Sequence, residues 1–407
     1  MDAVVLEQLR QHSFGDFPVL QHVGYAGRHA QIVFQYIECA IAIANQTPSA
    51  ISMSKPNPSS STTRQCSASG ARSSSARAIP LRKRDLSPAP ASRTVGGYAR
   101  IRRQFKLPIG RFEGVEEALA RIGAYTYMMD AARSLTAVAL DRGEKPSVIS
   151  AIVKYHLTEG MRQVINDGMD VLGGAGICLG PRNLLGRAYQ SIPISITVEG
   201  ANILTRSLII FGQGAIRCHP FLFREMEAVS QHDVAGLDAA LSGHVSLALG
   251  NITRSLFHSL TRGRLLPAPQ HGIAGHYYRQ FGRMSLAFAV TTELALASLG
   301  GSLKRRESLS GRLGDVLSLL YLGSAVLKQY FDQGSPEEDL PLLQHACDDL
   351  LFNIQSRLYQ IMDNLPNRAV AGLARLLTFP AGKPYRPPLD KLSHRVTGLI
   401  LRPGRVR

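Results

Sequence analysis

A single carboxylate, Glu199, interrupts the largely uncharged stretch of residues 188–204. Gly200 follows it and lets the backbone approach a ligand closely, and an apolar helical run comes next. Burial among apolar groups raises the pKa of a carboxylate, because the loss of water disfavours the charged form. Such a group suits a general base that removes a weakly acidic C–H proton. The alternative is an acid at a helix start that only complements the helix dipole.

Two further segments could bind phosphate groups. Arg100, Arg102 and Arg103 place three guanidinium groups at one short helix end, and arginine offers a planar fork of donors that matches phosphate. Residues 173–176 (GGAG) could let backbone N–H groups approach a pyrophosphate. The arginine segment can also be interpreted as a solvated basic helix terminus. The glycine segment can also be interpreted as a helix–helix turn. The glycines lack the spacing of a dinucleotide fingerprint, and a helix instead of a strand precedes them.

The sequence predicts neither a metal site nor a disulfide framework. Its twelve histidines have no metal-ligand spacing, and its five cysteines include no Cys-x-x-Cys pair. His156 and His219 are interpreted as structural residues. The odd cysteine count fits a reducing, cytoplasmic environment, and peripheral contact with the inner membrane stays open.

The net charge of +16 makes a nucleic-acid or membrane-surface partner the first hypothesis to weigh. The basic residues are spread along the chain and are not interleaved with aromatic side chains, so we expect no nucleic-acid partner. We also expect no transmembrane segment. The most apolar stretches, 31–45 and 286–299, contain Glu38 and Glu293, and both are shorter than the ~20 apolar residues that cross a bilayer.

Residues 51–93 are rich in Ser, Pro and Arg and carry almost no large apolar side chains. Such a segment cannot bury enough surface to offset its ordering entropy, so we expect residues 1–93 to be atypical and largely disordered. From Gly96 onward, apolar residues recur at three and four positions, which predicts amphipathic helices. The expected helices span 111–141, 147–172, 182–190, the stretch from Glu199 to Gly214, 233–261, 274–300, 306–333 and 339–364, with a glycine-rich loop at 173–181 and a connector, SIPISI, at 191–196.

Three segments, taken in order, resemble the flavin-dependent acyl-CoA dehydrogenases. Residues 102–109 (RRQFKLPI), with Phe112-Glu113 after them, are similar to the family's Arg-x-x-Phe…Pro-Ile…Phe-Gln segment. Residues 170–176 (DVLGGAG) are similar to its Gln-x-x-Gly-Gly-x-Gly turn, and residues 198–200 (VEG) to its Tyr-Glu-Gly. The tail, with PNRAVAGL and PLDKLSHRV, resembles the large bacterial fatty-acid-degrading type, so the likeness covers residues 94–407.

The resemblance implies an all-α fold. Residues 95–220 would form a four-helix bundle like the acyl-CoA dehydrogenase C-terminal domain, and residues 221–407 an additional bacterial-type helical domain. The implied activity is FAD-dependent α,β-dehydrogenation of fatty acyl-CoA to trans-2-enoyl-CoA in fatty-acid β-oxidation. A base removes the α-proton, and the β-carbon passes a hydride to N5 of FAD. The implied partners are a fatty acyl-CoA, an electron-transferring flavoprotein and further copies of the chain in a homo-oligomer.

By the resemblance, Glu199 is the catalytic base, and its backbone N–H helps to hold the thioester oxygen, as in an oxyanion hole. The residues implied at FAD are Arg102, Gln104, Phe105, Glu113, Asp170, Gly173 and Gly174. Arg102 and Gln104 would contact its phosphate and ribityl groups, and the glycine turn would approach its adenosine end, often from the partner subunit. Asp170 and Glu113 stand where the family has glutamine, so an amide donor is lost at two of these contacts.

The family's N-terminal helical domain and the β domain that covers its flavin are not recognisable in residues 1–93. The sequence therefore predicts a truncated, fused or frame-shifted product. We expect weak FAD binding and low or absent turnover, because a flavin open to water on one side lacks a dry catalytic pocket. The alternative function is a non-catalytic helical fragment that only self-associates or binds an intact subunit.

Overall fold

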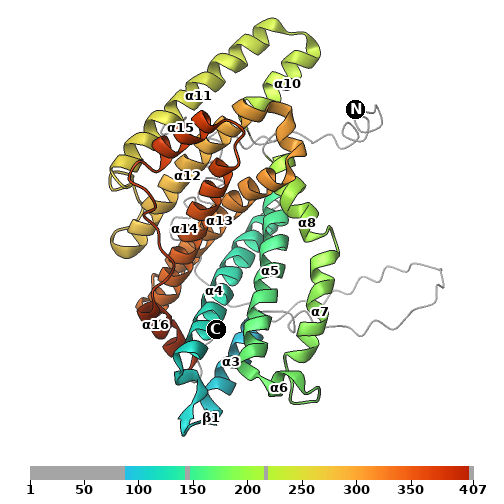
Figure 1. Cartoon of the computed structure of the whole chain (residues 1–407), viewed down its shortest axis with the longest axis vertical. Helices are drawn as coiled ribbons and strands as arrows, with labels where there is room; N and C mark the ends of the chain where they lie inside the picture. Colours follow the sequence, from blue (N-terminus) through green and yellow to red (C-terminus); the bar gives the residue numbers. More distant parts are fainter. Residues whose placement is uncertain (1–87, 143–146, 215–218, 403–407) are drawn as a thin grey trace, which may run out of the picture.

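The computed structural model describes residues 88–142, 147–214 and 219–402, and the expectations for residues 1–87 lie outside these ranges. The described chain is almost entirely helical (Figure 1), which confirms the all-α prediction. Its elements, in chain order, are α3 (Pro88–Ile101), β1 (Arg103–Gln104), β2 (Leu107–Pro108), η2 (Ile109–Arg111), α4 (Glu113–Asp141), α5 (Ser147–Leu172), α6 (Gly174–Ile177), α7 (Gly186–Thr197), α8 (Asn202–Leu204), η3 (Thr205–Gln213), α10 (Leu222–Gln231), α11 (Val234–Leu260), α12 (Gly272–Leu299), η4 (Gly300–Arg305), α13 (Glu307–Asp332), η5 (Glu337–Asp339), α14 (Leu340–Asp363), α15 (Arg368–Thr378) and α16 (Asp390–Ile400).

The first bundle is built around α4 and α5, which lie side by side (Figure 1), with α3 packed on both and α7 on α5. The predicted helices 111–141 and 147–172 agree with α4 and α5 within two residues. One ion pair joins the two helices inside the bundle. The Arg121 guanidinium donates to both carboxylate oxygens of Asp167, at 2.8 and 2.9 Å, and Asp167 is buried. This bidentate geometry sets the register of α5 on α4.

The expected disorder is wrong for residues 88–93, which form the start of α3. Ala91, Val95 and Ala99 recur every fourth residue and are buried in the core that α3 shares with α4 and α5. Pro88 stands at the first helical position, where the missing N–H removes no helical hydrogen bond. The described part of α3 therefore reaches into the Ser- and Pro-rich sequence, where its small apolar face packs on α4 and α5.

Two expectations about the segment around Glu199 are also wrong in detail. Residues 191–196, expected as a connector, continue α7 through Pro193. That proline is exposed, so water can satisfy the carbonyl that loses its helical N–H. The helix expected directly after Glu199 begins only at Asn202 and passes within one turn into the nine-residue π-helix η3. Short π-helical segments are frequently found at functional sites.

The C-terminal region is dominated by long helices, as predicted, since the four expected ranges from 233 to 364 agree with α11, α12, α13 and α14 within two residues. Three shorter helices, α10, α15 and α16, were not predicted from the sequence. Each has only 10 or 11 residues, so its periodic pattern is hard to recognise between Gly- and Pro-rich joints. In α15 the Asn367 side chain accepts from the N–H of Ala369 at 2.8 Å and caps the helix start.

The two regions on either side of residue 220 share one core. Buried side chains of α4, α5 and η3 belong to the same cluster as those of α12, α13, α14 and α15. The last helix, α16, returns to the first bundle and packs on α4. A side chain at Gly123 would place its Cβ 2.6 Å from Ile400 Cδ1, so glycine is what allows this close approach.

By length and composition, Gly272–Arg305 could cross a membrane, and so could the bent pair Gly186–Thr197 and Asn202–Gly212. In the fold, the first of these is the central helix of the core. α12 packs against α11, α13, α14 and α15, and most of the side chains in its middle are buried. Its apolar composition is therefore accounted for by burial inside the protein.

Candidate functional site

Glu199 occupies the joint between α7 and α8, with φ of 55°, and Gly200 follows with φ of 96°. A non-glycine residue in this left-handed region costs about 1–3 kcal/mol and often marks a functional position. The side chain of Glu199 is exposed, so the expected burial among apolar groups is wrong for the described part of the chain. Its neighbours Val198 and Ile203 are also exposed, 48% and 83%. Among the described helices, α7 packs mainly on α5 (Figure 1).

Lys154, on α5, fixes the backbone of this joint. Its ammonium group donates to the carbonyl of Gly200 at 2.5 Å, to Asn202 Oδ1 at 2.6 Å and to the carbonyl of Ile196 at 3.2 Å. All three donors of the ammonium group are therefore used. Desolvation lowers the pKa of Lys154, and the negative charges of Glu199 and a second glutamate oppose that effect. No local pattern in the sequence points to this lysine, which lies 46 positions before Gly200.

Asn202, which follows the joint in the chain, also ties the joint to α5. Its amide nitrogen donates to Thr158 Oγ1 at 2.9 Å and to Glu159 Oε1 at 2.8 Å, both on α5. Asn202 is 3% exposed, and the hydrogen bonds satisfy both ends of its amide. The polar face of α5 thus holds the strained turn in place, while the Glu199 side chain stays exposed.

The arginine-bearing segment forms a β-hairpin that the sequence analysis did not predict. β1 pairs antiparallel with β2, and the turn between them places Phe105 and Lys106 at φ of 48° and 65°. Phe105 is 87% exposed and lies edge-to-face with Phe112, with ring centroids 6.3 Å apart. The side chains of Arg102 and Gln104 are exposed as well. The described residues leave these donor groups and this aromatic face uncovered.

Glu113 opens α4 next to this hairpin and is exposed. Asp170 is exposed at the end of α5, and the chain then turns at Gly173, with φ of 54°. A Cβ at Gly173 or Gly174 would meet nothing within 4 Å among the described residues. The turn is therefore open, and its left-handed residue favours glycine. The amide of Asn183 organises the following loop, since its Oδ1 accepts from the N–H of Gly186 at 2.7 Å.

The hairpin and the glycine turn lie at the same end of the bundle, where β1 and α6 are labelled, whereas α8, which follows Glu199 in the chain, lies toward the other end (Figure 1). Along α7 alone, 12 residues separate the two ends by about 18 Å at 1.5 Å per residue. The predicted base and the predicted cofactor-binding groups of one chain do not meet in one pocket of the described residues.

A second polar cluster, which the sequence analysis did not connect, joins α10, α11 and α12. His244 Nε2 lies 3.0 Å from Glu293 Oε2, and its Nδ1 lies 2.7 Å from Glu225 Oε1. The hydrogen bond with Glu293 raises the pKa of His244 to about 9, against partial burial, and Glu225 adds to the effect. Burial alone would raise the pKa of Glu293, but hydrogen bonds from His219 and His244 outweigh it and hold that pKa at about 2.

The ligand atoms of His219, His244 and Glu293 lie within 4.8 Å of one another, a spacing that could hold a metal ion. The hydrogen bonds favour protons instead. His219 Nδ1 accepts from the backbone N–H groups of Phe221 and Leu222, at 3.2 and 3.1 Å. Its proton therefore sits on Nε2, the atom that would have to bind the metal, and donates to Glu293 at 3.1 Å. The cluster is a buried ion-pair network, which supports the structural interpretation of His219.

Residues 90–211 match the family described as "Acyl-CoA dehydrogenase, C-terminal domain", and residues 216–407 match "Acyl-CoA dehydrogenase, C-terminal, bacterial type". Together the two matches cover the described chain apart from its edges and the short joint between them. Their border falls at residues 211–216, close to the end of η3.

Parts of the chain are similar in sequence to other proteins. The mitochondrial very long-chain specific acyl-CoA dehydrogenase of Mus musculus is 25% identical over 279 residues, which are 66% of this chain and 40% of that protein. A 3-(aryl)acrylate reductase of Clostridium sporogenes is 28% identical over 115 residues, 28% of this chain and 29% of that protein. The chain thus spans less than half of the length of these relatives.

The fold is similar to the crystal structure of an acyl-CoA dehydrogenase complexed with FAD from Bacillus anthracis. The TM-score is 0.58 at 17% identity, over 78% of this chain and 54% of that one. At this identity the likeness supports the fold.

Proposed function

The chain belongs to the acyl-CoA dehydrogenase family and carries its C-terminal domains, and from this premise we propose that it supplies the base-bearing part of FAD-dependent α,β-dehydrogenation of fatty acyl-CoA. The observation that carries the proposal is the turn at Glu199. A glutamate in a left-handed conformation is costly, and Lys154 and Asn202 hold it there with five hydrogen bonds. Such a turn presents a carboxylate and an adjacent backbone N–H at a fixed position.

In this proposal the Glu199 carboxylate takes the α-proton of the thioester, and its own N–H donates to the thioester oxygen as negative charge develops there. FAD, when bound, supplies the hydride acceptor. The exposure of Glu199 means that the described residues do not exclude water from the reacting atoms. We infer that turnover by this chain is low or absent unless further protein covers this side of α7.

The residues expected at FAD have free donor groups suited to it. Arg102 and Gln104 would hold the phosphate and ribityl groups, Phe105 offers an uncovered aromatic face, and Gly173 leaves open space beside its backbone. Because these groups lie at the opposite end of the bundle from Glu199, we propose that they serve the cofactor of a second copy in a homo-oligomer. The carboxylates of Asp170 and Glu113 add no donors, which weakens FAD binding.

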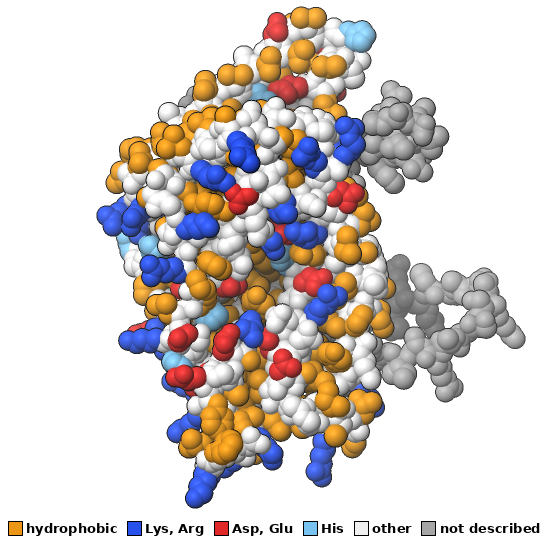
Figure 2. Space-filling model, viewed as in Figure 1, with side chains coloured by type: hydrophobic (Ala, Val, Ile, Leu, Met, Phe, Trp, Pro, Cys, Tyr) orange, Lys and Arg blue, Asp and Glu red, His pale blue; other side chains and the backbone are white. Residues whose placement is uncertain are grey.

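We propose an electron-transferring flavoprotein as the electron acceptor and a cytoplasmic location at the periphery of the inner membrane. The location is supported by an exposed apolar stripe on α11, where Leu241, Val245 and Leu249 recur at four-residue spacing and are 50–60% exposed. Figure 2 shows apolar side chains over α11 at the top of the molecule, while acidic and basic side chains are interspersed lower on that face.

Flavin absorbance of the purified full chain tests the proposal. We expect weak, saturable FAD binding, and slow bleaching of the bound flavin by palmitoyl-CoA. The variant Glu199→Gln keeps the shape of the side chain, so FAD binding should persist while bleaching slows by roughly 10²–10⁴-fold, the usual contribution of a general base. Equal bleaching rates would remove Glu199 from the mechanism.

The second candidate is a non-catalytic helical module that only self-associates or binds an intact subunit. The exposed carboxylate and the uncovered hairpin favour it, since no dry pocket is built by the described residues. A chain that stays colourless at every FAD concentration, yet elutes as a defined oligomer on size-exclusion chromatography, would favour this function over dehydrogenation.

A further inference from the structure

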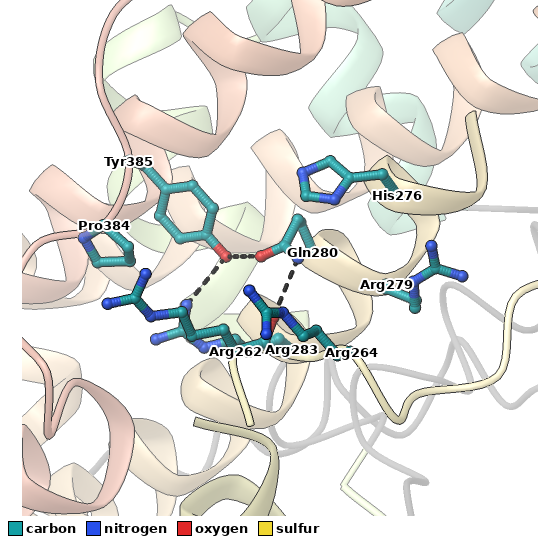
Figure 3. Close-up of a pocket in the computed structure, with 8 residues that line it drawn as sticks. All are labelled: Arg262, Arg264, His276, Arg279, Gln280, Arg283, Pro384 and Tyr385. Carbon is teal, nitrogen blue, oxygen red and sulfur yellow. Dashed lines mark hydrogen bonds between the residues drawn. The ribbon is translucent and has the colours of Figure 1, made fainter. Parts of the chain in front are cut away.

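A cavity of about 440 Å³ lies in the C-terminal region, far from the joint that holds Glu199. It is enclosed by the turn between α11 and α12, the first half of α12 and the extended segment after α15 (Figure 3). Four of its lining side chains are arginines, and the described residues that line it include no acidic side chain: Arg262, Arg264, Arg279 and Arg283. The cavity therefore concentrates positive charge in a recess.

Arg283 is the innermost of these arginines and is 3% exposed. Its guanidinium donates to the carbonyl of Thr378 and to the hydroxyl of Tyr385, both at 3.3 Å. It also lies over the rings of Phe379 and Tyr385, 5.7 and 5.6 Å from their centroids. Its Nε is buried and has no hydrogen-bond partner among the described residues. A buried charge is normally paired, and here the described chain supplies no carboxylate for it.

The rim of the cavity is held in place by a defined hydrogen-bond chain. Tyr385 donates from its hydroxyl to Gln280 Oε1 at 2.8 Å, and Gln280 Nε2 donates to the carbonyl of Arg262 at 3.1 Å. The backbone of Tyr385 is in turn clamped by both ends of the Gln355 amide, at 3.0 and 3.1 Å. Three separate segments are therefore fixed around the same space (Figure 3).

The turn that carries Arg262 and Arg264 lies directly on α12. Gly263 has φ of 73°, and a Cβ there would lie 3.3 Å from the carbonyl oxygen of Arg279. Glycine thus allows the turn to sit close to α12, which brings the two arginines of the turn beside Arg279 and Arg283. A spacing of four residues puts Arg279 and Arg283 on one face of the helix.

We propose that this cavity binds a phosphate-bearing anion. Guanidinium groups match phosphate oxygens with paired hydrogen bonds, and four of them around one recess favour a ligand with two or more negative charges. The volume lies in the range of about 300–1,000 Å³ that is usual for small-molecule sites. A bound anion would also supply the negative charge that the described chain does not place beside the buried Arg283. The site is separate from the residues expected at FAD and does not depend on the proposed dehydrogenation.

Isothermal titration calorimetry of the full chain with inorganic pyrophosphate, at constant ionic strength, tests the proposal. The double variant Arg264→Gln/Arg279→Gln removes two rim charges and leaves the buried Arg283 in place, so the fold should persist. The matched control, Lys304→Gln/Arg305→Gln, removes two exposed charges that do not line the cavity. Circular dichroism of all three proteins checks that the helical content is unchanged.

We expect one saturable site that weakens at least about tenfold in the rim variant, since hydrogen bonds to charged groups are the strong ones, and stays within about twofold in the control. The absence of saturable pyrophosphate binding would overturn the proposal. Equal weakening in both variants would overturn it too, because it would reduce the effect to net charge.

The phosphate group could belong to a soluble phosphate ester or to a lipid headgroup, and flotation with vesicles separates the two sources. If vesicles of phosphatidylglycerol bind the chain, pyrophosphate competes with them and the rim variant does not bind, the ligand is a lipid headgroup. If pyrophosphate binds but these vesicles do not, the ligand is a soluble phosphate compound. Either result supports an anion site in this cavity.

Discussion

Replacing His244 by glutamine should loosen the contact between α10, α11 and α12 in a way that depends on pH. The imidazolium bridges two carboxylates, Glu225 and Glu293, at 2.7 and 3.0 Å, and its side chain is 18% exposed. A pKa raised from 6.5 to about 9 corresponds to about 3 kcal/mol of stabilisation, at about 1.4 kcal/mol for each tenfold change. The lowered pKa of Glu293 describes the same contacts, so the two effects are not added.

The direction with pH follows from these pKa values. Because the folded pKa of His244 is raised, its contribution is fully present below about pH 6.5 and is lost as the pH rises through about 9. The pKa of Glu293 is lowered to about 2, so its contribution is present above its ordinary value of 4.5 and is lost as the pH falls toward 2. The contact is therefore most stable between about pH 4.5 and 6.5.

Hydrogen exchange measured by mass spectrometry reports the local opening of this contact. At pH 6, amides of α10 and of the first half of α11 in His244→Gln should open roughly a hundredfold more often than in the unmodified chain, and at pH 10 the two should converge. His258→Gln, on the same helix but without a carboxylate partner in the described chain, is the matched control. A difference of the same size at pH 6 and pH 10, or an equal effect in the control, would refute the assignment of a charged His244.

Three further substitutions, two of them with a matched control, test other parts of the structure. Lys154→Met removes three hydrogen bonds to the joint between α7 and α8, so hydrogen exchange there should show a loss of local stability of about 1–3 kcal/mol. Asp315→Asn breaks a buried pairing with two arginines and should cost about 3–5 kcal/mol in thermal unfolding, whereas the exposed ion-pair control Asp332→Asn should cost less than about 1 kcal/mol. Gly323→Ala would place a Cβ 2.3 Å from a phenylalanine ring and should lower the free energy of unfolding by about 1–3 kcal/mol. Its control, Gly250→Ala, lies in a helix with nothing within 4 Å of the new Cβ and should raise the free energy of unfolding by about 0.5–1 kcal/mol. Similar unfolding midpoints for the two members of either pair would contradict these packing assignments.

The amino-acid sequence determined the long helices of this protein. In α4, α5 and α11 to α14, apolar residues recur over six or more turns, and this local pattern needs no knowledge of the partner. It also placed Glu199 and Gly200 at a break between helices. The short α15 and the start of α3 were not predicted, because a few helical turns give little periodic signal. Burial against a surface that is distant in sequence decides whether such short helices form.

Only the tertiary structure decided which of these side chains meet. Glu199 lies at an apolar stretch of sequence but is exposed, because burial depends on what covers α7 and not on neighbours along the chain. The lysine that fixes its backbone comes from another helix, 46 positions away. The sequence shows four arginines at positions 262, 264, 279 and 283. Only the four-residue spacing of Arg279 and Arg283 indicates, locally, that two of them share one face of a helix. These arginines and Tyr385 line one cavity, and the described residues around it include no acidic side chain. The cavity forms only because the chain returns after α15, a long-range contact that no local pattern encodes.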